Sequence, residues 1–176
     1  MGRREEIGQM RRSYGDAGLS EADLAKNPVE QLHRWLADAA ANEFIVEANA
    51  MVLSTYADGA PTSRSVLLKD LTQAGLTFFT NYNSRKANAI AQNPNVSILF
   101  PWYAMERQVA VTGTAQKVSE EESAKYFATR PRESQLGAWA SSQSEPLASR
   151  EELEKSYKEF EAKFPNEVPK PPHWGG

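Results

Sequence analysis

Cationic and hydroxyl side chains recur beside apolar segments in the middle of this sequence. They lie in residues 64–69 (Arg-Ser-Val-Leu-Leu-Lys), 80–86 (Thr-Asn-Tyr-Asn-Ser-Arg-Lys), 106–108 (Glu-Arg-Gln) and 126–134 (Tyr-Phe-Ala-Thr-Arg-Pro-Arg-Glu-Ser). Because buried cations must be paired, a purely structural role explains these residues poorly. A phosphorylated ligand would supply the partners. Two phosphorylated ligands explain the number of clusters better than one.

The segment Asn83-Ser84-Arg85-Lys86 is expected where a strand turns into a helix. Free N–H groups and the positive end of the helix dipole favour an anion there, and the two cations add full charges. The alternative is an N-capped surface helix whose basic residues are solvated. For this segment taken by itself, that alternative is the better interpretation.

Arg64 and Lys69 flank an apolar core. On a regular strand, residues five apart point to opposite faces, so the two cations can serve two different ligands. Alternatively, one of them reaches along a sheet edge to solvent. Lysine at an edge strand is also a common guard against aggregation, and that interpretation is equally good for this segment.

Tyr126 and Arg130 are four apart on an expected helix and therefore share a face. Ser134 follows the break at Pro131 and can curl back toward them. A phenol, a guanidinium and a hydroxyl together suit a phosphate monoester, with the guanidinium as a bidentate fork. Tyr and Arg also pair on many helices merely as a surface contact.

Two amide side chains could contact a heterocycle. Gln108 is expected to face a strand interior, where its amide offers a donor and an acceptor to a ring edge such as that of a flavin. A cross-strand pair is the more common role. Gln143 and Ser144 lie in a small polar loop, for which an ordinary turn is the alternative.

The composition narrows the class of protein. The 176 residues fit one domain, and 40% of them are hydrophobic. We expect no membrane span, because no apolar run is long enough, and no secretion, because the first residues are charged. A net charge of −3 argues against a nucleic-acid partner. With no cysteine and only His33 and His173, no metal site is expected, and the default location is cytoplasmic.

Strands and helices must position these side chains. Turn signals such as Asp58-Gly59 and β-branched or aromatic runs predict strands over 51–57, 64–71, 76–82, 96–102 and 108–118. Capping residues predict helices after Asn27, Ser84, Ser119 and Ser149, and Pro131 ends the third of them. Residues 1–26 are expected to form a mobile arm. Residues 27–176 are expected to form an α+β domain around a mainly antiparallel barrel.

In this order, the motifs resemble the pyridoxine/pyridoxamine 5′-phosphate oxidase family. The matching segments include Arg-x-Val-Leu-Leu-Lys, Phe-Thr-Asn-x-x-Ser-Arg-Lys, Glu-Arg-Gln-Val, Tyr-Phe-x-x-Arg-Pro-Arg-x-Ser-Gln-x-Gly-Ala-Trp and Val-Pro-x-Pro-x-x-Trp-Gly-Gly. The resemblance covers residues 11–176 and implies an FMN-binding split β-barrel with peripheral helices. It also implies a homodimer with FMN at the interface. The implied reaction oxidises pyridoxine or pyridoxamine 5′-phosphate to pyridoxal 5′-phosphate, with O2 as acceptor and H2O2 as product.

The resemblance assigns residues to two ligands. FMN would be held by Arg64, Ser65, Val66, Leu67, Leu68, Lys69, Phe79, Thr80, Arg85, Lys86, Gln108, Gln143 and Ser144. The 5′-phosphate of the substrate would be held by Lys69, Tyr126, Arg130 and Ser134. A lid over the substrate would be formed by Arg11, Arg12, Ser13 and Tyr14. No residue is assigned a catalytic role, because the flavin performs the chemistry.

Other members of the family continue after Trp-Gly-Gly into a strand with an Arg-x-His pair and further flavin contacts. This sequence stops at Gly176, and His173 does not match that histidine. We expect a shortened sequence rather than a shortened natural protein, because every earlier motif is intact. The alternative function is a module that binds flavin or vitamer without turnover.

Overall fold

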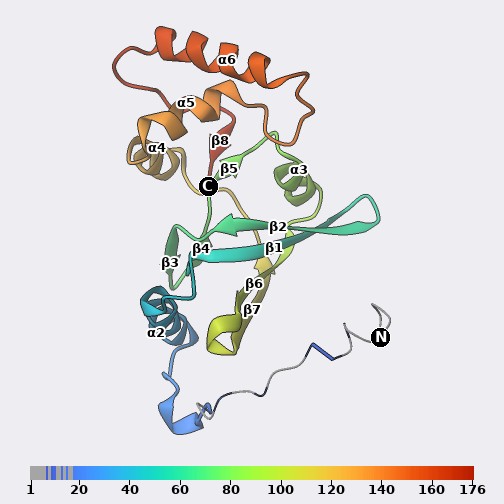
Figure 1. Ribbon diagram of the computed structural model, residues 1–176, viewed down its shortest axis with the longest axis vertical. Coiled ribbons are helices and arrows are strands. Elements are labelled where there is room, and N and C mark those ends of the chain that lie inside the picture. The colour runs from blue at the N-terminus through green and yellow to red at the C-terminus, as the bar shows by residue number, and fades with distance from the viewer. Residues whose placement is uncertain (1–6, 8, 11–12, 14, 16–17) are drawn as a thin grey trace. The chain divides into compact units, whose positions relative to one another are not determined.

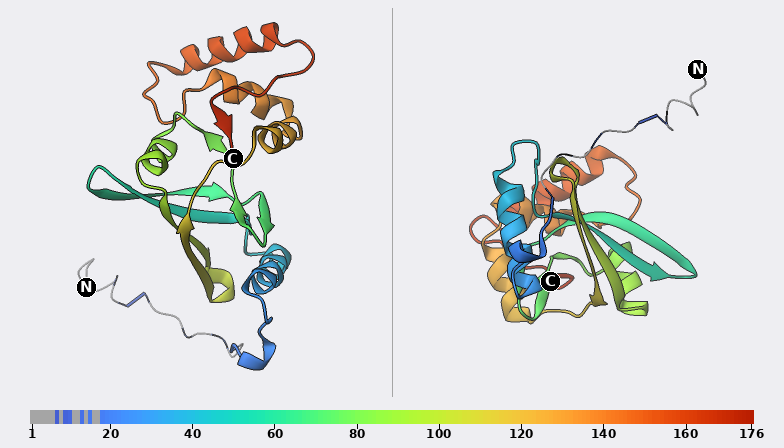
Figure 2. Two further views of the ribbon diagram at one scale, coloured as in Figure 1. Left: turned by 180° about the vertical axis from the view of Figure 1, so that it is seen from behind. Right: turned by 90° about the horizontal axis from the view of Figure 1, so that it is seen from below.

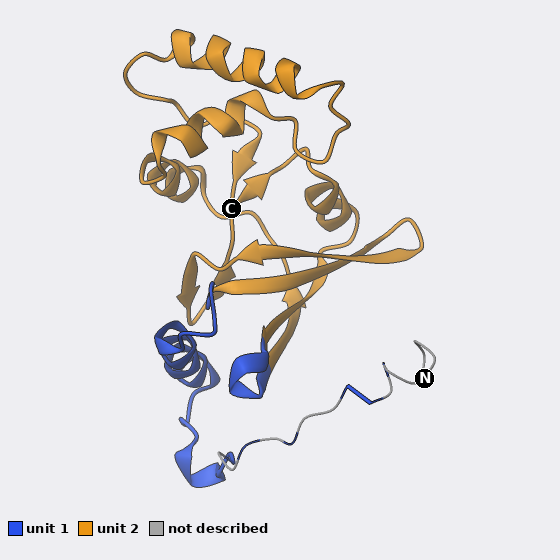
Figure 3. Ribbon diagram, viewed as in Figure 1, with its two compact units in different colours: residues 1–48, 102–108 blue, residues 49–101, 109–176 orange. Residues whose placement is uncertain are grey.

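The structure is a computed structural model that describes residues 7, 9–10, 13, 15 and 18–176. The chain divides into two compact units (Figure 3). The first contains residues 1–48 and 102–108, and the second contains residues 49–101 and 109–176. No helix in the described ranges is long and apolar enough to cross a membrane. The predicted boundary between an arm and a barrel domain at residue 26 stays a prediction.

The first unit is organised around helix α2 (Pro28–Ala41) and also holds the short turns η1 (Glu21–Asp23) and η2 (Tyr103–Met105). Asn27 caps α2, as predicted: its side chain accepts a hydrogen bond of 2.8 Å from the amide of Val29. Arg107 forms an ion pair of 3.1 Å with Asp38. This pair ties the turn at residues 102–108 to the helix.

A four-stranded sheet in the order β2-β1-β6-β7 forms the centre of the second unit (Figure 1). Its strands are β1 (Ala50–Ala57), β2 (Ala60–Leu67), β6 (Asn95–Trp102) and β7 (Arg107–Thr114). β1 and β2 form the antiparallel hairpin predicted at Asp58-Gly59, and Leu53 lies opposite Arg64 in its register. β1 also pairs antiparallel with β6.

Two short antiparallel pairs join β3 (Asp70–Thr72) with β4 (Gly75–Thr77), and β5 (Thr80–Asn81) with β8 (Trp174–Gly175). The predicted continuous strands over 64–71 and 76–82 are therefore wrong. The first is interrupted because the backbone changes partners: the amide of Leu68 donates to Asn49, and that of Lys69 donates to Thr77. The strand predicted to end at residue 118 ends at Thr114, after which the Ala115 amide bonds to Pro94.

Four helices surround these strands: α3 (Arg85–Gln92), α4 (Glu120–Ala128), α5 (Arg132–Ala140) and α6 (Arg150–Lys163). Ser84, Ser119 and Ser149 cap α3, α4 and α6, as predicted. The sequence analysis interpreted Pro131 only as a break and missed α5. Proline lacks an N–H group, so it tolerates the start of a helix as well as the end of the previous one.

The helices cover the strands in two places (Figures 1 and 2). α3 packs against β1, whereas α5 packs along α6 and α4 contacts β8. A buried cluster joins these last elements through Phe127, Leu136, Val168 and Trp174. The segment from Val168 to β8 is therefore part of the hydrophobic core. Burial of this apolar surface is the main force that holds the segment in place.

Candidate functional site

Lys86 lies in the first turn of α3 among neutral polar groups. Its Nζ donates to Thr80 Oγ1 at 3.1 Å, to Ser84 Oγ at 3.4 Å and to Gln143 Oε1 at 2.7 Å. Thr80 Oγ1 in turn donates to Gln143 Oε1 at 3.0 Å. The structure thus brings Gln143 to three residues of the segment 80–86, from which it is distant in sequence. The resemblance had assigned three of these four residues to FMN, namely Thr80, Lys86 and Gln143.

Arg64 projects from β2 and is held by the hairpin itself. Its Nη1 donates to the carbonyl of Leu53 and to Thr55 Oγ1, both at 3.0 Å, and its Nη2 donates to Thr62 Oγ1 at 2.6 Å. All of these acceptors are neutral. The hairpin therefore fixes the guanidinium without neutralising its charge.

Arg64, Arg85 and Lys86 form an electropositive cluster, which we call the α3 cluster. Burial, followed by the charge of Arg85, lowers the pKa of Arg64. Burial, followed by the charge of Arg64, lowers the pKa of Lys86. Within the described part of the chain, none of the three cations has an acidic ion-pair partner. Together with the N-terminus of α3, the cluster is suited to a phosphate.

A stack of aromatic rings includes Phe79. This residue directly precedes Thr80, whose hydroxyl accepts a hydrogen bond from Lys86 of the α3 cluster. The rings of Phe79 and Tyr126 have centroids 4.0 Å apart at 13°, and those of Phe79 and Trp174 are 5.3 Å apart at 9°. Phe127 meets Trp174 edge-on, at 5.0 Å and 70°. Stacked rings of this kind build a rigid apolar wall.

Arg130 lies over this wall. Its guanidinium carbon is 4.8 Å from the centroid of the Trp174 ring and 5.6 Å from that of Phe127. Nη1 of Arg130 is buried and, among the described residues, is the one buried side-chain nitrogen or oxygen without a hydrogen-bond partner. Burial lowers the pKa of Arg130, and the interaction with Tyr126 raises it to a smaller extent. A buried donor without an acceptor is costly, so this atom is suited to an anionic ligand.

The structure changes several expectations about the residues predicted to hold the substrate phosphate. Arg130 follows the end of α4 at Ala128 rather than sharing a helical face with Tyr126, which corrects that expectation. Ser134 lies in the first turn of α5 and is half-buried, and in the described part of the chain no hydrogen bond joins its side chain to Arg130. Lys69 is exposed beyond the end of β2, so the face argument based on a regular strand does not apply to it.

The remaining predicted residues differ in exposure. Gln108 is exposed on β7, which contradicts the expectation that it faces a strand interior; it belongs to the first unit, and its role stays a prediction. Ser144 is exposed with a φ of 73°. In β2 and just after it, Ser65 is exposed, Leu68 is buried, and the side chains between them are half-buried, namely Val66 and Leu67. Ser13 is exposed, whereas Arg11, Arg12 and Tyr14 lie outside the described residues.

The roles of Trp174 and Thr55 are not predicted from the sequence. For Trp174, only its place in the Trp-Gly-Gly motif could have indicated a role. Thr55 is 2% exposed on β1, and its hydroxyl accepts from Arg64. A polar residue at a buried strand position was the available signal for it.

A cleft of about 840 Å³ opens next to the α3 cluster within the second unit. It is lined by residues of β3–β5, α3 and the segment 114–119, including Thr80, Tyr82, Ala87, Lys117 and Gly176. Its volume is in the range of small-molecule sites.

Solved structures and sequence relatives define the class to which this arrangement belongs. PhzG from Burkholderia lata, solved with tetrahydrophenazine-1-carboxylic acid, matches at a TM-score of 0.82 and 28% identity over 90% of this chain and 79% of that one. A pyridoxamine 5′-phosphate oxidase-related, FMN-binding protein from Nostoc punctiforme matches at a TM-score of 0.65 and 17% identity, over 86% and 79%. The expected α+β split-barrel fold is confirmed.

The family follows from sequence similarity. Residues 37–164 match the family described as pyridoxamine 5′-phosphate oxidase. The pyridoxine/pyridoxamine 5′-phosphate oxidases of Streptomyces avermitilis and Rubrobacter xylanophilus are each 51% identical to this chain. The matches cover 95% and 99% of this chain, and 77% and 81% of the relatives' lengths. The chain therefore belongs to the pyridoxamine 5′-phosphate oxidase family of oxidoreductases.

Proposed function

We propose that this protein is an FMN-dependent oxidase that converts pyridoxine or pyridoxamine 5′-phosphate to pyridoxal 5′-phosphate, with O2 as acceptor. The observation that carries the proposal is the buried Nη1 of Arg130 beside the aromatic wall, which has no hydrogen-bond partner among the described residues. The α3 cluster, whose cations have no acidic ion-pair partner in the same part of the chain, is a second cationic site and accounts for the phosphate of the cofactor. Family membership supports FMN as that cofactor.

The α3 cluster fits an FMN phosphate by charge and by donor chemistry. Burial, and to a smaller extent repulsion by Arg64, lowers the pKa of Lys86, and a dianion between the two cations would offset both costs. Arg85 adds a third, more exposed charge. Thr80 and Gln143 orient the Lys86 ammonium through hydrogen bonds and so fix where the phosphate is held.

The Arg130 site fits the phosphate of the substrate. The guanidinium offers planar, paired donors, and the rings of Trp174 and Phe127 beneath it exclude water from one side of it. Because Phe79 and Thr80 are neighbours, one short segment joins the two sites. Holding the vitamer by its phosphate would fix its orientation before reaction.

The bound flavin would supply the two-electron acceptor, and O2 would take the electrons from it to give H2O2. The protein's own residues bind, orient and exclude water, and no side chain is required as a nucleophile. The homodimer with FMN at its interface, and the roles of Gln108, Ser144 and residues 11–14, stay predictions.

The proposal is tested by anaerobic reduction. Pyridoxine 5′-phosphate is added to the FMN-loaded protein without oxygen, and the flavin absorbance is followed. We expect bleaching, recovery of colour in air, and formation of pyridoxal 5′-phosphate. Retained colour with bound, unconverted vitamer would contradict turnover and favour the alternative, a binding module.

Unphosphorylated pyridoxine provides the matched control. It has the same reacting carbon but lacks the group assigned to Arg130. We expect it to bleach the flavin only at far higher concentration. Equal efficiency of the two compounds would contradict the assignment of Arg130 to a phosphate.

A further inference from the structure

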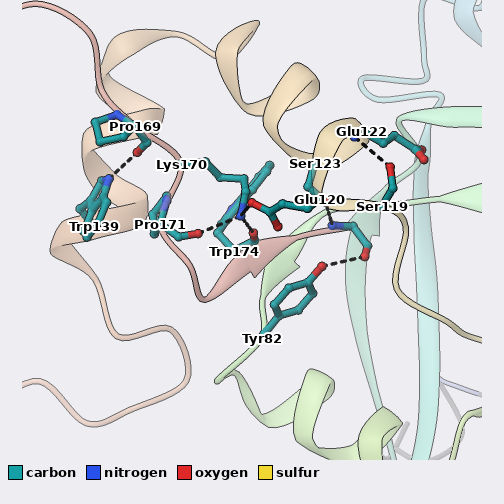
Figure 4. A network of polar contacts seen from close by, with 11 residues as sticks. Tyr82, Ser119, Glu120, Glu122, Ser123, Trp139, Pro169, Lys170, Pro171 and Trp174 are labelled. Atoms are coloured by element: carbon teal, nitrogen blue, oxygen red, sulfur yellow. Dashed lines mark hydrogen bonds and ion pairs between the residues drawn. The ribbon is translucent and has the colours of Figure 1, made fainter.

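Lys170 is a buried cation that neither proposed ligand site uses. Its side chain is 5% exposed, whereas that of its ion-pair partner, Glu120, is 78% exposed. The Nζ atom donates to the carbonyls of Pro171 at 3.1 Å and Trp174 at 2.8 Å, and it lies 2.9 Å from Glu120 Oε1 (Figure 4). An ammonium has three donors, and all three are satisfied. Burial of the lysine is therefore compensated.

These contacts close a turn just before β8. The Trp174 amide also donates to the Pro171 carbonyl, at 3.1 Å, so the lysine and the backbone share one acceptor. Glu120 is the first residue of α4, and its carboxylate joins this turn to that helix. Lys170 thus fixes the turn both internally and against α4.

The fixed turn leads directly into residues 173–176, whose backbone is hydrogen-bonded to other parts of the second unit. The Tyr82 amide donates to the carbonyl of His173 at 2.6 Å, and the Val118 amide donates to that of Gly176 at 3.1 Å. The Gly176 amide donates to Ser123 Oγ at 3.3 Å (Figure 4). Tyr82 and Val118 lie outside residues 173–176, so the protection of their amides from solvent reports whether this segment is docked.

Arg130 depends on this segment for its position. Its Nη1 has no hydrogen-bond partner among the described residues, and its guanidinium lies over the Trp174 ring at 4.8 Å. The ring itself is held by Phe79 on its face and by the backbone of residue 174, whose carbonyl Lys170 binds. A displacement of Trp174 would therefore displace the guanidinium.

We propose that Lys170 is a positioning residue for the anion site of Arg130, acting through Trp174. This inference rests on the proposed function, because it takes the substrate phosphate as the ligand of Arg130. Loss of the ammonium would remove a buried donor from two carbonyls and break the link to Glu120. The Trp174 ring would then lose its fixed position, and Arg130 would lose pre-organisation for a phosphate.

The test compares Lys170→Met, which keeps an unbranched side chain out to Cε but removes the ammonium, with Lys125→Met at an exposed position of α4. Two quantities are measured in FMN-loaded protein: the Kd for pyridoxal 5′-phosphate, and the hydrogen-exchange rates of the Tyr82 and Val118 amides. For Lys170→Met we expect about tenfold weaker pyridoxal 5′-phosphate binding and about tenfold faster exchange at both amides. FMN affinity should change by less than about threefold. Lys125→Met should match the wild type.

Glu120→Gln provides a second variant that should fold, since the Glu120 side chain is exposed. It keeps an acceptor but removes the charge, so it should shift both quantities in the same direction by a smaller amount. If Lys170→Met does not fold, Glu120→Gln replaces it in both measurements.

Unchanged exchange and unchanged affinity in Lys170→Met would overturn the proposal. Faster exchange with unchanged pyridoxal 5′-phosphate affinity would also overturn it, because the segment would then be held by Lys170 without serving Arg130. Failure of the wild type to bind pyridoxal 5′-phosphate would instead refute the proposed function. The exchange rates need no vitamer, so they would still show whether Lys170 holds the segment.

Discussion

The guanidinium carbon of Arg130 lies 4.8 Å from the centre of the Trp174 ring, although the two residues are 44 positions apart in sequence. The ring supports the cation from one side but offers no acceptor for its N–H groups. An ordinary structural arginine would have a carboxylate or carbonyl there. The N–H donors of Arg130 are therefore pre-positioned for a ligand.

Substitution of Arg130 should separate the two proposed phosphate sites. We expect Arg130→Ala to weaken pyridoxal 5′-phosphate binding by at least about tenfold, since a charge-assisted hydrogen bond is lost. FMN binding should stay within about threefold of the wild type, because in the described part of the chain no hydrogen bond joins Arg130 to the α3 cluster. Isothermal titration of each ligand measures both effects. Arg150→Ala, at an exposed position on α6, is the matched control, and equal losses for both ligands would refute the assignment.

The affinity for FMN should depend on pH through Lys86. Burial, followed by the charge of Arg64, lowers the pKa of Lys86 in the free protein, and a bound phosphate would favour the ammonium and raise that pKa again. Binding then takes up a proton, so the affinity for FMN should fall as the pH rises above the lowered pKa of the free protein. Flavin fluorescence titrations at increasing pH measure this slope. Lys86→Met should bind FMN more weakly and lose the slope, and an identical slope in the variant would contradict this role.

Gly175 should tolerate no side chain. A Cβ at this position would lie 2.7 Å from Tyr82 Cζ and 2.9 Å from Ser123 Oγ. We expect Gly175→Ala to lower the free energy of unfolding by about 1–3 kcal/mol, because β8 must move away from Tyr82 and α4. Thermal denaturation measures the loss. Gly113→Ala on β7, where a Cβ meets nothing within 4 Å, should show no such loss.

Ser84 should contribute both to stability and to FMN binding. It is fully buried, and its Oγ caps α3 and accepts from Lys86 Nζ. Ser84→Ala should cost about 1 kcal/mol of unfolding free energy and should also weaken FMN binding, since Lys86 loses a partner. Ser149→Ala removes the exposed cap of α6 and should affect stability alone. Equal FMN affinity in both variants would argue against a role for Ser84 in the α3 cluster.

The local elements of this fold were predictable from sequence. Asn27, Ser84, Ser119 and Ser149 mark helix starts correctly because a cap is a contact within one turn. The turn at Asp58-Gly59 was equally clear, since its left-handed backbone favours these residue types.

The interrupted strands and α5 were not predictable in the same way. The breaks at Leu68 and after Thr77 arise because the backbone changes pairing partners, which is a tertiary effect. Pro131 gave an ambiguous signal, because the same residue ends one helix and begins another.

The two candidate sites were predictable in part. Arg64, Lys86 and Arg130 were identified as anion-binding candidates by charge beside apolar residues. The geometry of the two sites depends on contacts between residues that are distant in sequence, such as Gln143 with Lys86 and Trp174 with Arg130. No local pattern encodes those contacts, and the ion pair of Lys170 with Glu120 was likewise visible only in the fold.

A crystal structure with FMN and pyridoxal 5′-phosphate bound together is the most direct measurement. Two phosphorus atoms should appear, one bridging Arg64 and Lys86 and the other within hydrogen-bond reach of Arg130 Nη1. Density for either phosphate away from its assigned cations, or for both at one of the two sites, would contradict the assignment of two separate phosphoester sites to this protein.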